Sequence, residues 1–257
     1  MISKPVTHRN STANLVLASV PPKDSKRLWA RLELVPLKFG QILYQPEETI
    51  QHVYFPLDSV ISLLTTVDKR RSLEVGMIGN EGMAGTPFIL GMGVSAVRAL
   101  VQGGGTAMRM ASGPFRAEFQ RNSALQQALY RYTYALMTQI SQTAACNRFH
   151  GTEARLARWL LMTRDRVGSN DFPLTHEFLA HMLGLRREGV TEAAGVFRRR
   201  KLISYSRGQL KILNIKGLEA ESCSCYRTVN TVFERVQAQR PATRNVPGRD
   251  RVSVSLT

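Results

Sequence analysis

The chain has 257 residues, of which 43% are hydrophobic and 21% charged, and its 35 basic against 19 acidic residues give a net charge of +16. No apolar run reaches the roughly 18–20 residues that a membrane-spanning helix needs, so we expect none. The N-terminus lacks the apolar core of a signal peptide, and three cysteines are too few for a disulfide framework, so we expect a cytoplasmic protein. The positive charge favours a polyanionic partner, nucleic acid before an anionic membrane surface.

The chain is predicted to begin with an arm and a short helix. Residues 1–22 are polar and end in two prolines, which is typical of a flexible arm. Asp24 can cap a short helix that carries Leu28, Trp29 and Leu32.

Short apolar runs separated by turn residues then dominate the chain as far as about residue 110. This pattern predicts closely spaced strands of an antiparallel barrel or jelly roll. The clearest runs lie at 41–44, 53–55, 60–64, 73–75, 96–101 and 107–110. Glycines at every third position from Gly76 to Gly85 predict tight turns or close backbone approaches within this β-region.

A long helix is predicted at about 124–146. A shorter helix is expected to come before the long one, and Pro114 suits its first turn. Ser123 with Gln126 can form a capping box at the start of the long helix. One apolar face comprises Leu125, Leu129, Tyr132 and Leu136, and a second comprises Tyr130, Tyr134, Ala135, Met137 and Ile140. A helix apolar on two faces needs two partners. We expect these to be the β-region and the same helix of a second chain, with burial inside one subunit as the alternative.

The C-terminal part has denser positive charge, with its tightest cluster at 198–201. Gly151 ends the long helix, and Thr152 can cap the next one. We then expect a loop at 168–173, a β-hairpin around Arg207-Gly208 at 202–213, a last helix at 216–236 and a disordered tail from Arg240.

The most specific signal lies between Thr175 and Phe197. A helix-turn-helix needs a small residue where its helices cross, a glycine four residues later in the turn, and a β-branched apolar residue six further on. Ala180, Gly184 and Val190 have this spacing. Apolar positions between them are filled by Leu179, Leu183 and Leu185, and Thr175 suits an N-cap, with Glu177 in the first turn. The hairpin at 202–213 would then be a wing.

This geometry predicts which side chains meet DNA, because the first turns of the second helix enter the major groove. The residues expected near base edges are Arg186, Arg187, Glu188, Thr191 and Glu192. The residues expected at phosphates are Arg199, Arg200, Lys201, Arg207 and Lys211.

A glycine-punctuated β-region, a long helix and a winged helix-turn-helix in this order resemble the CRP/FNR superfamily of bacterial transcription regulators. The resemblance covers roughly 25–215 and is strongest over 153–161 and 174–202. It implies a cyclic-nucleotide-binding-like jelly roll, a homodimer on an inverted-repeat operator in double-stranded DNA, and RNA polymerase as a candidate further partner. Arg187 and Glu188 match the base-reading pair of the family, whereas its second base-reading arginine falls at Glu192.

The predicted fold is therefore α+β. Its parts are a flexible arm at 1–22, a sensor domain at 23–112, a dimerisation helix at 113–150, a winged helix-turn-helix domain at 151–222, and a helix with a disordered tail at 223–257. The predicted function is that of a sequence-specific, dimeric transcriptional regulator with no membrane partner. The alternative is a ligand- or protein-binding jelly-roll module without specific DNA binding.

The sensor domain keeps only part of the family's nucleotide pocket. A degenerate pocket would comprise Gly79, Glu81, Gly82, Ser95 and Arg98. The resemblance places Glu81 at the ribose, but residues 91–96 contain no arginine for the cyclic phosphate, and a buried phosphate without its cation is strongly disfavoured. We therefore predict no response to cAMP.

No cofactor, metal or catalytic residue is predicted. Cys146, Cys223 and Cys225 are too few for an iron–sulfur cluster. Cys146 and His150 lie one helical turn apart and could hold a metal, although a packing or dimer-interface role is favoured. Cys223 and Cys225 could be redox-active or bind a metal, although two surface or half-buried cysteines near a helix are favoured. His52 is the single histidine of the β-region, so a metal-dependent jelly-roll enzyme is disfavoured.

Overall fold

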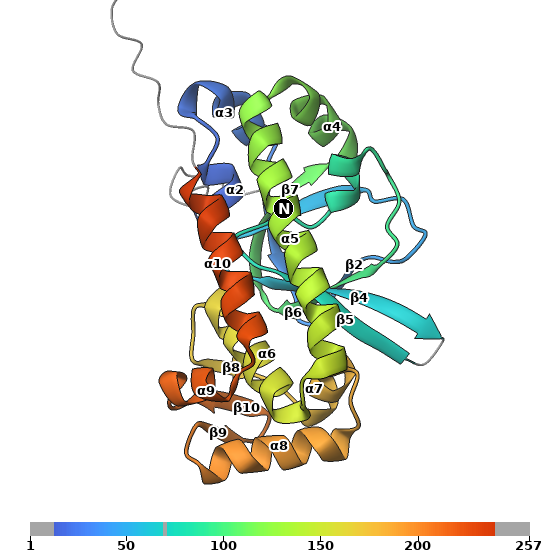
Figure 1. Ribbon diagram of the computed structural model, residues 1–257. Helices are drawn as coiled ribbons and strands as arrows, with labels where there is room; N and C mark the ends of the chain where they lie inside the picture. The colour runs from blue at the N-terminus through green and yellow to red at the C-terminus, as the bar shows by residue number, and fades with distance from the viewer. Residues whose placement is uncertain (1–12, 69–70, 240–257) are drawn as a thin grey trace, which may run out of the picture.

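The computed structural model describes residues 13–68 and 71–239. Its N-terminal β-domain is joined by a long helix to a C-terminal helical domain with a small sheet (Figure 1). The expected tail from Arg240 and the first part of the expected arm lie outside the described residues.

Residues 13–22 contain helix α2 and the start of α3, so the prediction of a flexible arm is wrong for these residues. Helix α2 (Leu15–Ala18) follows Asn14, whose side chain accepts a hydrogen bond from Leu17 N. The Asn14 amide also donates to the carbonyl of Pro56 at 2.9 Å, which ties this segment to the β-domain. Helix α3 (Pro22–Trp29) begins after Pro21, so Asp24 lies in its first turn instead of capping it.

Two antiparallel sheets form the β-domain. One has the order β1 (Glu33–Leu37), β7 (Gly105–Ala111), β3 (His52–Pro56). The other has the order β2 (Ile42–Tyr44), β6 (Arg98–Gly103), β4 (Val60–Asp68), β5 (Arg71–Ile78). A 3₁₀ helix, η1 (Thr86–Leu90), follows β5. Each predicted run overlaps a strand. Strand β1 was not predicted, and it contains Pro36, which an edge strand paired only with β7 tolerates.

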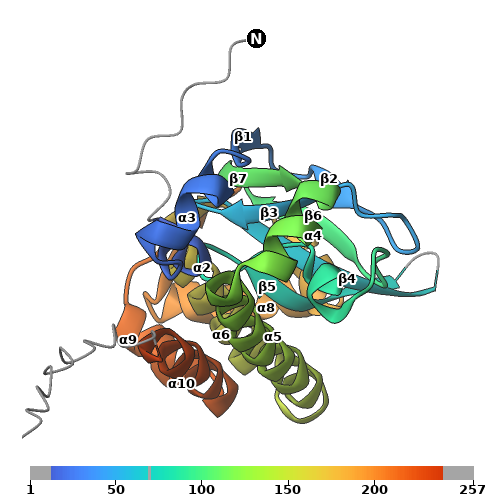
Figure 2. The ribbon, with the colours of Figure 1, turned by 90° about the horizontal axis from the view of Figure 1, so that it is seen from above.

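Helix α4 (Ser112–Arg121) leads into α5 (Ser123–Phe149), which crosses the whole molecule. The cap of α5 is Asn122, which accepts from Leu125 N at 3.0 Å, so the expected capping box at Ser123 does not form. The predicted core seam is confirmed, because Leu125, Leu129, Tyr132 and Leu136 are all buried. Helix α10 (Ser224–Ala238) packs along α5, and Figures 1 and 2 show the two side by side.

The C-terminal domain comprises α6 (Thr152–Val167), β8 (Asp171–Pro173), α7 (His176–Leu183), α8 (Arg187–Arg199), β9 (Ile203–Ser206), β10 (Gln209–Ile212) and α9 (Ile215–Glu221). Gly151 occupies the N-cap of α6, where Thr152 was expected. The expected loop at 168–173 contains β8, which pairs with β10. The expected last helix is two helices, because residues 222–223 separate α9 from α10. Over 13–68 and 71–239, no helix combines the length and apolarity of a membrane span.

Candidate nucleic-acid interface

The two helices of the predicted helix-turn-helix are α7 and α8. Thr175 caps α7 by accepting a hydrogen bond from Phe178 N at 3.1 Å. Gly184 ends α7 in the left-handed conformation, with φ +60°, which a residue without a Cβ adopts at little cost. Arg186 is the N-cap residue of α8, so the first turn of the second helix starts with Arg187 and Glu188.

Packing between the two helices explains the residue types at positions 180, 184 and 190. Ala180 and Val190 are 7% and 0% exposed, and Leu179 and Leu183 are also buried between the helices and α6. Helix α6 supports the turn directly, because the buried guanidinium of Arg155 donates to the carbonyl of Leu183 at the end of α7. The crossing of α7 and α8 is therefore fixed by the core beneath it, which leaves the outer face of α8 free for other contacts.

The predicted wing is also present. Strands β9 and β10 pair antiparallel through a turn at Arg207 and Gly208. Both turn residues have positive φ, +50° and +77°, as a two-residue hairpin turn with the twist of its strands requires. Tyr205 anchors β9, since its hydroxyl donates to the carbonyl of Leu174 at 2.9 Å.

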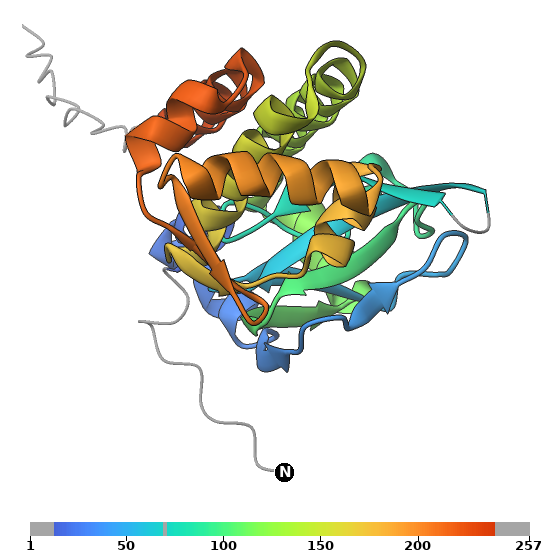
Figure 3. The same cartoon turned by 90° about the horizontal axis from the view of Figure 1, so that it is seen from below.

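The outer face of α8 and the wing carries the side chains that the sequence singled out for DNA. Figure 3 shows α8 lying across the lower surface of the molecule, with the wing beside it. All ten are exposed: Arg186, Arg187, Glu188, Thr191, Glu192, Arg199, Arg200, Lys201, Arg207 and Lys211. The structure thus brings these residues to one open and strongly basic side of the C-terminal domain.

Two of these side chains already have intramolecular partners. The hydroxyl of Thr191 donates to the carbonyl of Arg187 at 2.9 Å, and it lies 3.0 Å from Nδ1 of His176. Since that hydroxyl donates elsewhere, the His176 ring donates to it through Nδ1. Arg200 forms an ion pair with Glu221 at 2.7 Å, so it is less available for a phosphate than Arg199 or Lys201.

His176 is held in its neutral form beneath α8. Its ring stacks on Tyr205 with centroids 4.5 Å apart, and its Nε2 is buried with no hydrogen-bond partner. Burial and the nearby charge of Arg187 lower the pKa of His176. A neutral ring fits the tautomer required by Thr191, so the start of α8 carries no extra charge from this residue at neutral pH.

The residues predicted for an effector pocket do not form one open site. The buried carboxylate of Glu81 accepts from Nε of Arg166 on α6 at 2.8 Å, and its exposed fraction is 9%. A Cβ on Gly79 would lie 2.7 Å from the Arg166 side chain, and a Cβ on Gly82 would overlap the ring of Tyr132 on α5. The turn at 79–82 is therefore a surface on which α5 and α6 pack.

Ser95 and Arg98 have other partners. The hydroxyl of Ser95 is hydrogen-bonded to the backbone of Val97, and Nε of Arg98 donates to Oε1 of Gln45 at 2.7 Å. Backbone hydrogen bonds join Ser95 to the loop at 47–48. These two residues thus organise the end of β2, and they do not share contacts with Glu81.

A buried polar chain connects the β-domain to α6, and sequence reasoning missed it. The Ser62 hydroxyl lies 2.6 Å from a carboxyl oxygen of Glu74 and 2.5 Å from Oε1 of Gln102. One hydroxyl proton cannot serve two acceptors, so a protonated Glu74 completes the chain. Burial raises the pKa of Glu74 to about 7, whereas the hydrogen bonds that Ser62 and Trp159 on α6 can donate to its ionised form oppose that shift.

The β4–β5 hairpin also contacts the helix-turn-helix itself. Ser72 is hydrogen-bonded to Nε2 of His181 at the end of α7. A Cβ on Gly184 would lie 2.8 Å from Cδ1 of Leu73. Beside these contacts a cavity of about 500 Å³ lies between the hairpin, the end of α5 and the turn. The C-terminal domain is thus fixed to the β-domain both through α6 and through the turn after α7.

Comparison with known proteins agrees with this arrangement. Residues 154–221 match the Crp-like helix-turn-helix domain. A transcriptional regulator of the crp/fnr family from Eubacterium rectale is 17% identical with a TM-score of 0.63, over 82% of this chain and 97% of that one. FixK2 from Bradyrhizobium japonicum is 12% identical with a TM-score of 0.64, over 75% and 98%. The regulator CLP from Xanthomonas campestris is 13% identical with a TM-score of 0.61, over 75% and 99%. No curated protein matches the chain.

The fold and the exposed face of α8 define a DNA-binding protein of the winged helix-turn-helix class. Residues 154–221 are a Crp-like helix-turn-helix domain, and the chain has the fold of the CRP/FNR transcription regulators. The resemblance seen in the sequence and the predicted fold class are confirmed.

Proposed function

We propose that this protein is a homodimeric transcription regulator that binds an inverted-repeat operator and does not respond to cAMP. The observation that carries the proposal is the row of exposed side chains on the first turns of α8, next to a basic wing. Arg187 suits a guanine edge, because its guanidinium can donate to O6 and N7 together, and Glu188 can accept from the amino group of cytosine. Arg199, Lys201 and Arg207 suit phosphates that flank the groove.

The dimer is supported by an exposed apolar strip on α5. Tyr130, Tyr134 and Met137 are 52%, 60% and 61% exposed, although all three are large hydrophobic side chains. Their spacing of four and three residues is that of a coiled-coil seam. Half-sites one turn of DNA apart require the two copies of α8 in such a two-fold dimer to lie about 34 Å apart.

The absence of a cAMP response is supported by the partners of the expected pocket residues. A ribose hydroxyl at Glu81 would have to compete with the buried guanidinium of Arg166, and Gly79 and Gly82 lie against α6 and α5. Arg98 is engaged with Gln45. A nucleotide would gain neither a free carboxylate nor a free cation at these positions.

The deciding experiment compares base reading with phosphate binding. An operator is first selected from random duplexes with the purified full chain, and affinities of variants are then measured on that operator and on random DNA across a salt series. Arg187→Ala is expected to lose roughly 1–3 kcal/mol on the operator and little on random DNA. Lys201→Ala is expected to weaken both and to lower the salt slope by about one unit.

Lys23→Ala is the matched control, because Lys23 is an exposed lysine on α3, at the opposite end of the molecule from α8. It should bind both DNAs as the unaltered protein does. Equal losses on both DNAs for Arg187→Ala would show that α8 is not the reading helix. A protein with no measurable affinity for any duplex would instead support the jelly-roll binding module, and sedimentation of a monomeric complex on the operator would refute the dimer.

A further inference from the structure

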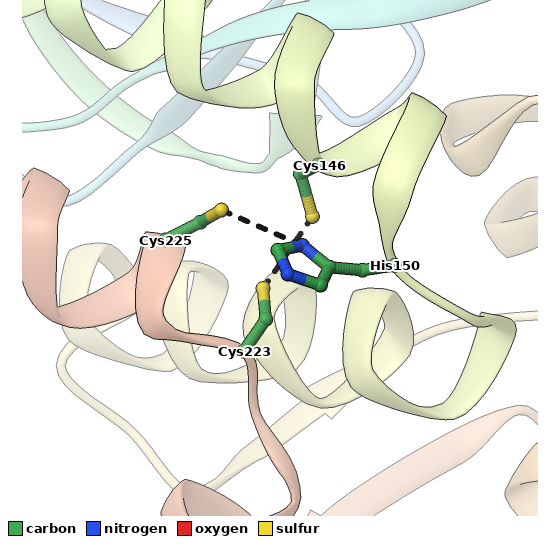
Figure 4. A group of neighbouring side chains, drawn as sticks. All are labelled: Cys146, His150, Cys223 and Cys225. Carbon is green, nitrogen blue, oxygen red and sulfur yellow. Dashed lines mark hydrogen bonds between the residues drawn. The ribbon is translucent and has the colours of Figure 1, made fainter.

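Four metal-ligating side chains converge at the junction between the long helix and the DNA-binding domain. Cys146 and His150 come from the end of α5, and Cys223 and Cys225 come from the start of α10 (Figure 4). Their sulfur and nitrogen atoms all lie within 4.8 Å of one another. Such convergence of all three cysteines of the chain with a histidine was not expected from the sequence, which favoured separate structural roles.

We propose that these residues form a Cys₃His site for a single zinc ion. A tetrahedral zinc with Zn–S distances near 2.3 Å and a Zn–N distance near 2.0 Å sets its ligand atoms about 3.5–3.8 Å apart. The sulfurs of Cys146 and Cys223 are 3.4 Å apart, and the sulfur of Cys225 is 3.6 Å from Nδ1 of His150. Small side-chain adjustments bring all four atoms to this spacing.

The donor set and its burial favour zinc over other ions. The three cysteines are 0%, 9% and 4% exposed, and His150 is half-buried, so the ligands form a closed shell. Three thiolates with one imidazole are soft ligands in a tetrahedral arrangement, as in structural zinc sites. Donor atoms this close together surround one ion and leave no room for the several irons of a cluster.

The charges around the site suit three thiolates bound to a divalent cation, which carry a net charge of −1. Cys223 and Cys225 lie at the N-terminal end of a 15-residue helix, whose dipole favours anions. The end of α5, with Cys146, favours a cation for the same reason. The hydrogen bond with Cys223 and burial raise the pKa of the Cys146 thiol, and burial raises the pKa of the Cys225 thiol. The charge of Arg158, which is only 6% exposed, opposes both shifts. Among the described residues no carboxylate forms an ion pair with Arg158.

The position of the site in the chain gives it a structural role. The ligands at 146 and 150 directly precede the Crp-like domain, and those at 223 and 225 directly follow it. One ion would therefore fasten both ends of the DNA-binding domain to the end of α5. On binding, each thiol releases its proton to solvent as its sulfur bonds to zinc, so affinity rises with pH.

Metal content tests the proposal directly. The full chain is purified under reducing conditions without chelator, and its metal content is measured by elemental mass spectrometry. We expect one zinc ion per chain. Cys146→Ser and the double variant Cys223→Ser/Cys225→Ser are expected to lose it. Ser224→Ala is the matched control, since this exposed residue lies between the two ligands of α10, and it should keep the full content. Zinc content that is unchanged in the cysteine variants would overturn the proposal.

A second measurement on the unaltered protein covers the case in which a cysteine variant does not fold. Replacement of zinc by Co²⁺ should give thiolate-to-cobalt charge-transfer absorption and tetrahedral ligand-field bands. X-ray absorption at the zinc edge should show three sulfurs and one nitrogen. An oxygen-rich six-coordinate spectrum, no uptake of either ion by the reduced protein, or a Cys146–Cys223 disulfide in the freshly purified chain would refute the site.

Discussion

The turn at 79–82 and the first turns of α8 differ in what covers them. The turn contains two glycines and a carboxylate, and the sequence made it part of a degenerate effector pocket. The first turns of α8 are rich in charged residues, and the sequence predicted that they meet DNA. The turn is covered by α5 and α6, and its one carboxylate is paired with Arg166. The first turns of α8 are exposed, with Arg187, Glu188 and Glu192 open to solvent. The comparison teaches that residue types identify candidate chemistry, whereas packing decides whether a ligand can reach it.

The largest loss of stability is expected from removing Arg166, which tests whether this side chain fastens the turn at 79–82. Its ion pair with Glu81 has exposed fractions of 7% and 9%, so Arg166→Ala removes the cation from a buried carboxylate and leaves it only the Gly79 N–H as a partner. We expect a loss of about 3–5 kcal/mol in the free energy of unfolding, measured by urea denaturation. Arg164→Ala is the control, since Arg164 forms a more exposed pair with Asp165, with side chains 31% and 29% exposed, and it should cost less than about 1 kcal/mol. Similar losses for both variants would show that the turn is not fastened by this pair.

Glu74 offers a pH-dependent test of the same interface. Its folded pKa of about 7 lies above the ordinary value of 4.5, so the folded state binds the extra proton. The stability from this group is complete below about pH 4.5 and is lost as pH rises through 7. We expect a loss on the order of 3 kcal/mol over that range. Glu74→Gln, which cannot ionise, should flatten the profile. Parallel profiles for the two proteins would contradict a protonated Glu74.

The smallest expected effect concerns the contact between the β4–β5 hairpin and the turn after α7. Gly184→Ala places a Cβ on a left-handed residue and against Leu73, so it should lower stability by about 1–2 kcal/mol. Gly189→Ala, where a Cβ would meet nothing within 4 Å, should be neutral or slightly stabilising because alanine favours a helix. Thermal unfolding of the two variants measures the difference, and a Gly184→Ala protein as stable as Gly189→Ala would exclude strain at this turn.

Local patterns predicted the DNA-binding domain well. The spacing of Ala180, Gly184 and Val190 is set by two helices that are joined by a short turn in the sequence. The turn at Arg207 and Gly208 depends on two consecutive residues. Because such features are set by neighbouring residues, a single sequence contains most of their information. The order of β-domain, long helix and winged domain was predicted for the same reason.

Contacts between distant residues could not be predicted. The partner of Glu81 is 85 residues away, and the sulfurs of Cys146 and Cys223 belong to residues 77 apart. No spacing rule connects these positions, since the contacts depend on how α6 and α10 pack. The i, i+4 pair Cys146–His150 and the Cys-x-Cys segment were the available signals, and each alone is a weak indication of a metal. Strand β1 was missed because Pro36 interrupts its pattern.

The packing of α10 along α5 limits the directions from which a second chain can approach. At about 100° per residue, Tyr130, Tyr134 and Met137 span an arc of roughly 60° on α5. The β-domain occupies one side of that helix, and Val229 and Phe233 of α10 belong to the same core. In the proposed dimer, a partner helix would be confined to a narrow sector of α5. The subunit's own C-terminal helix would then restrict the rotation between the two subunits.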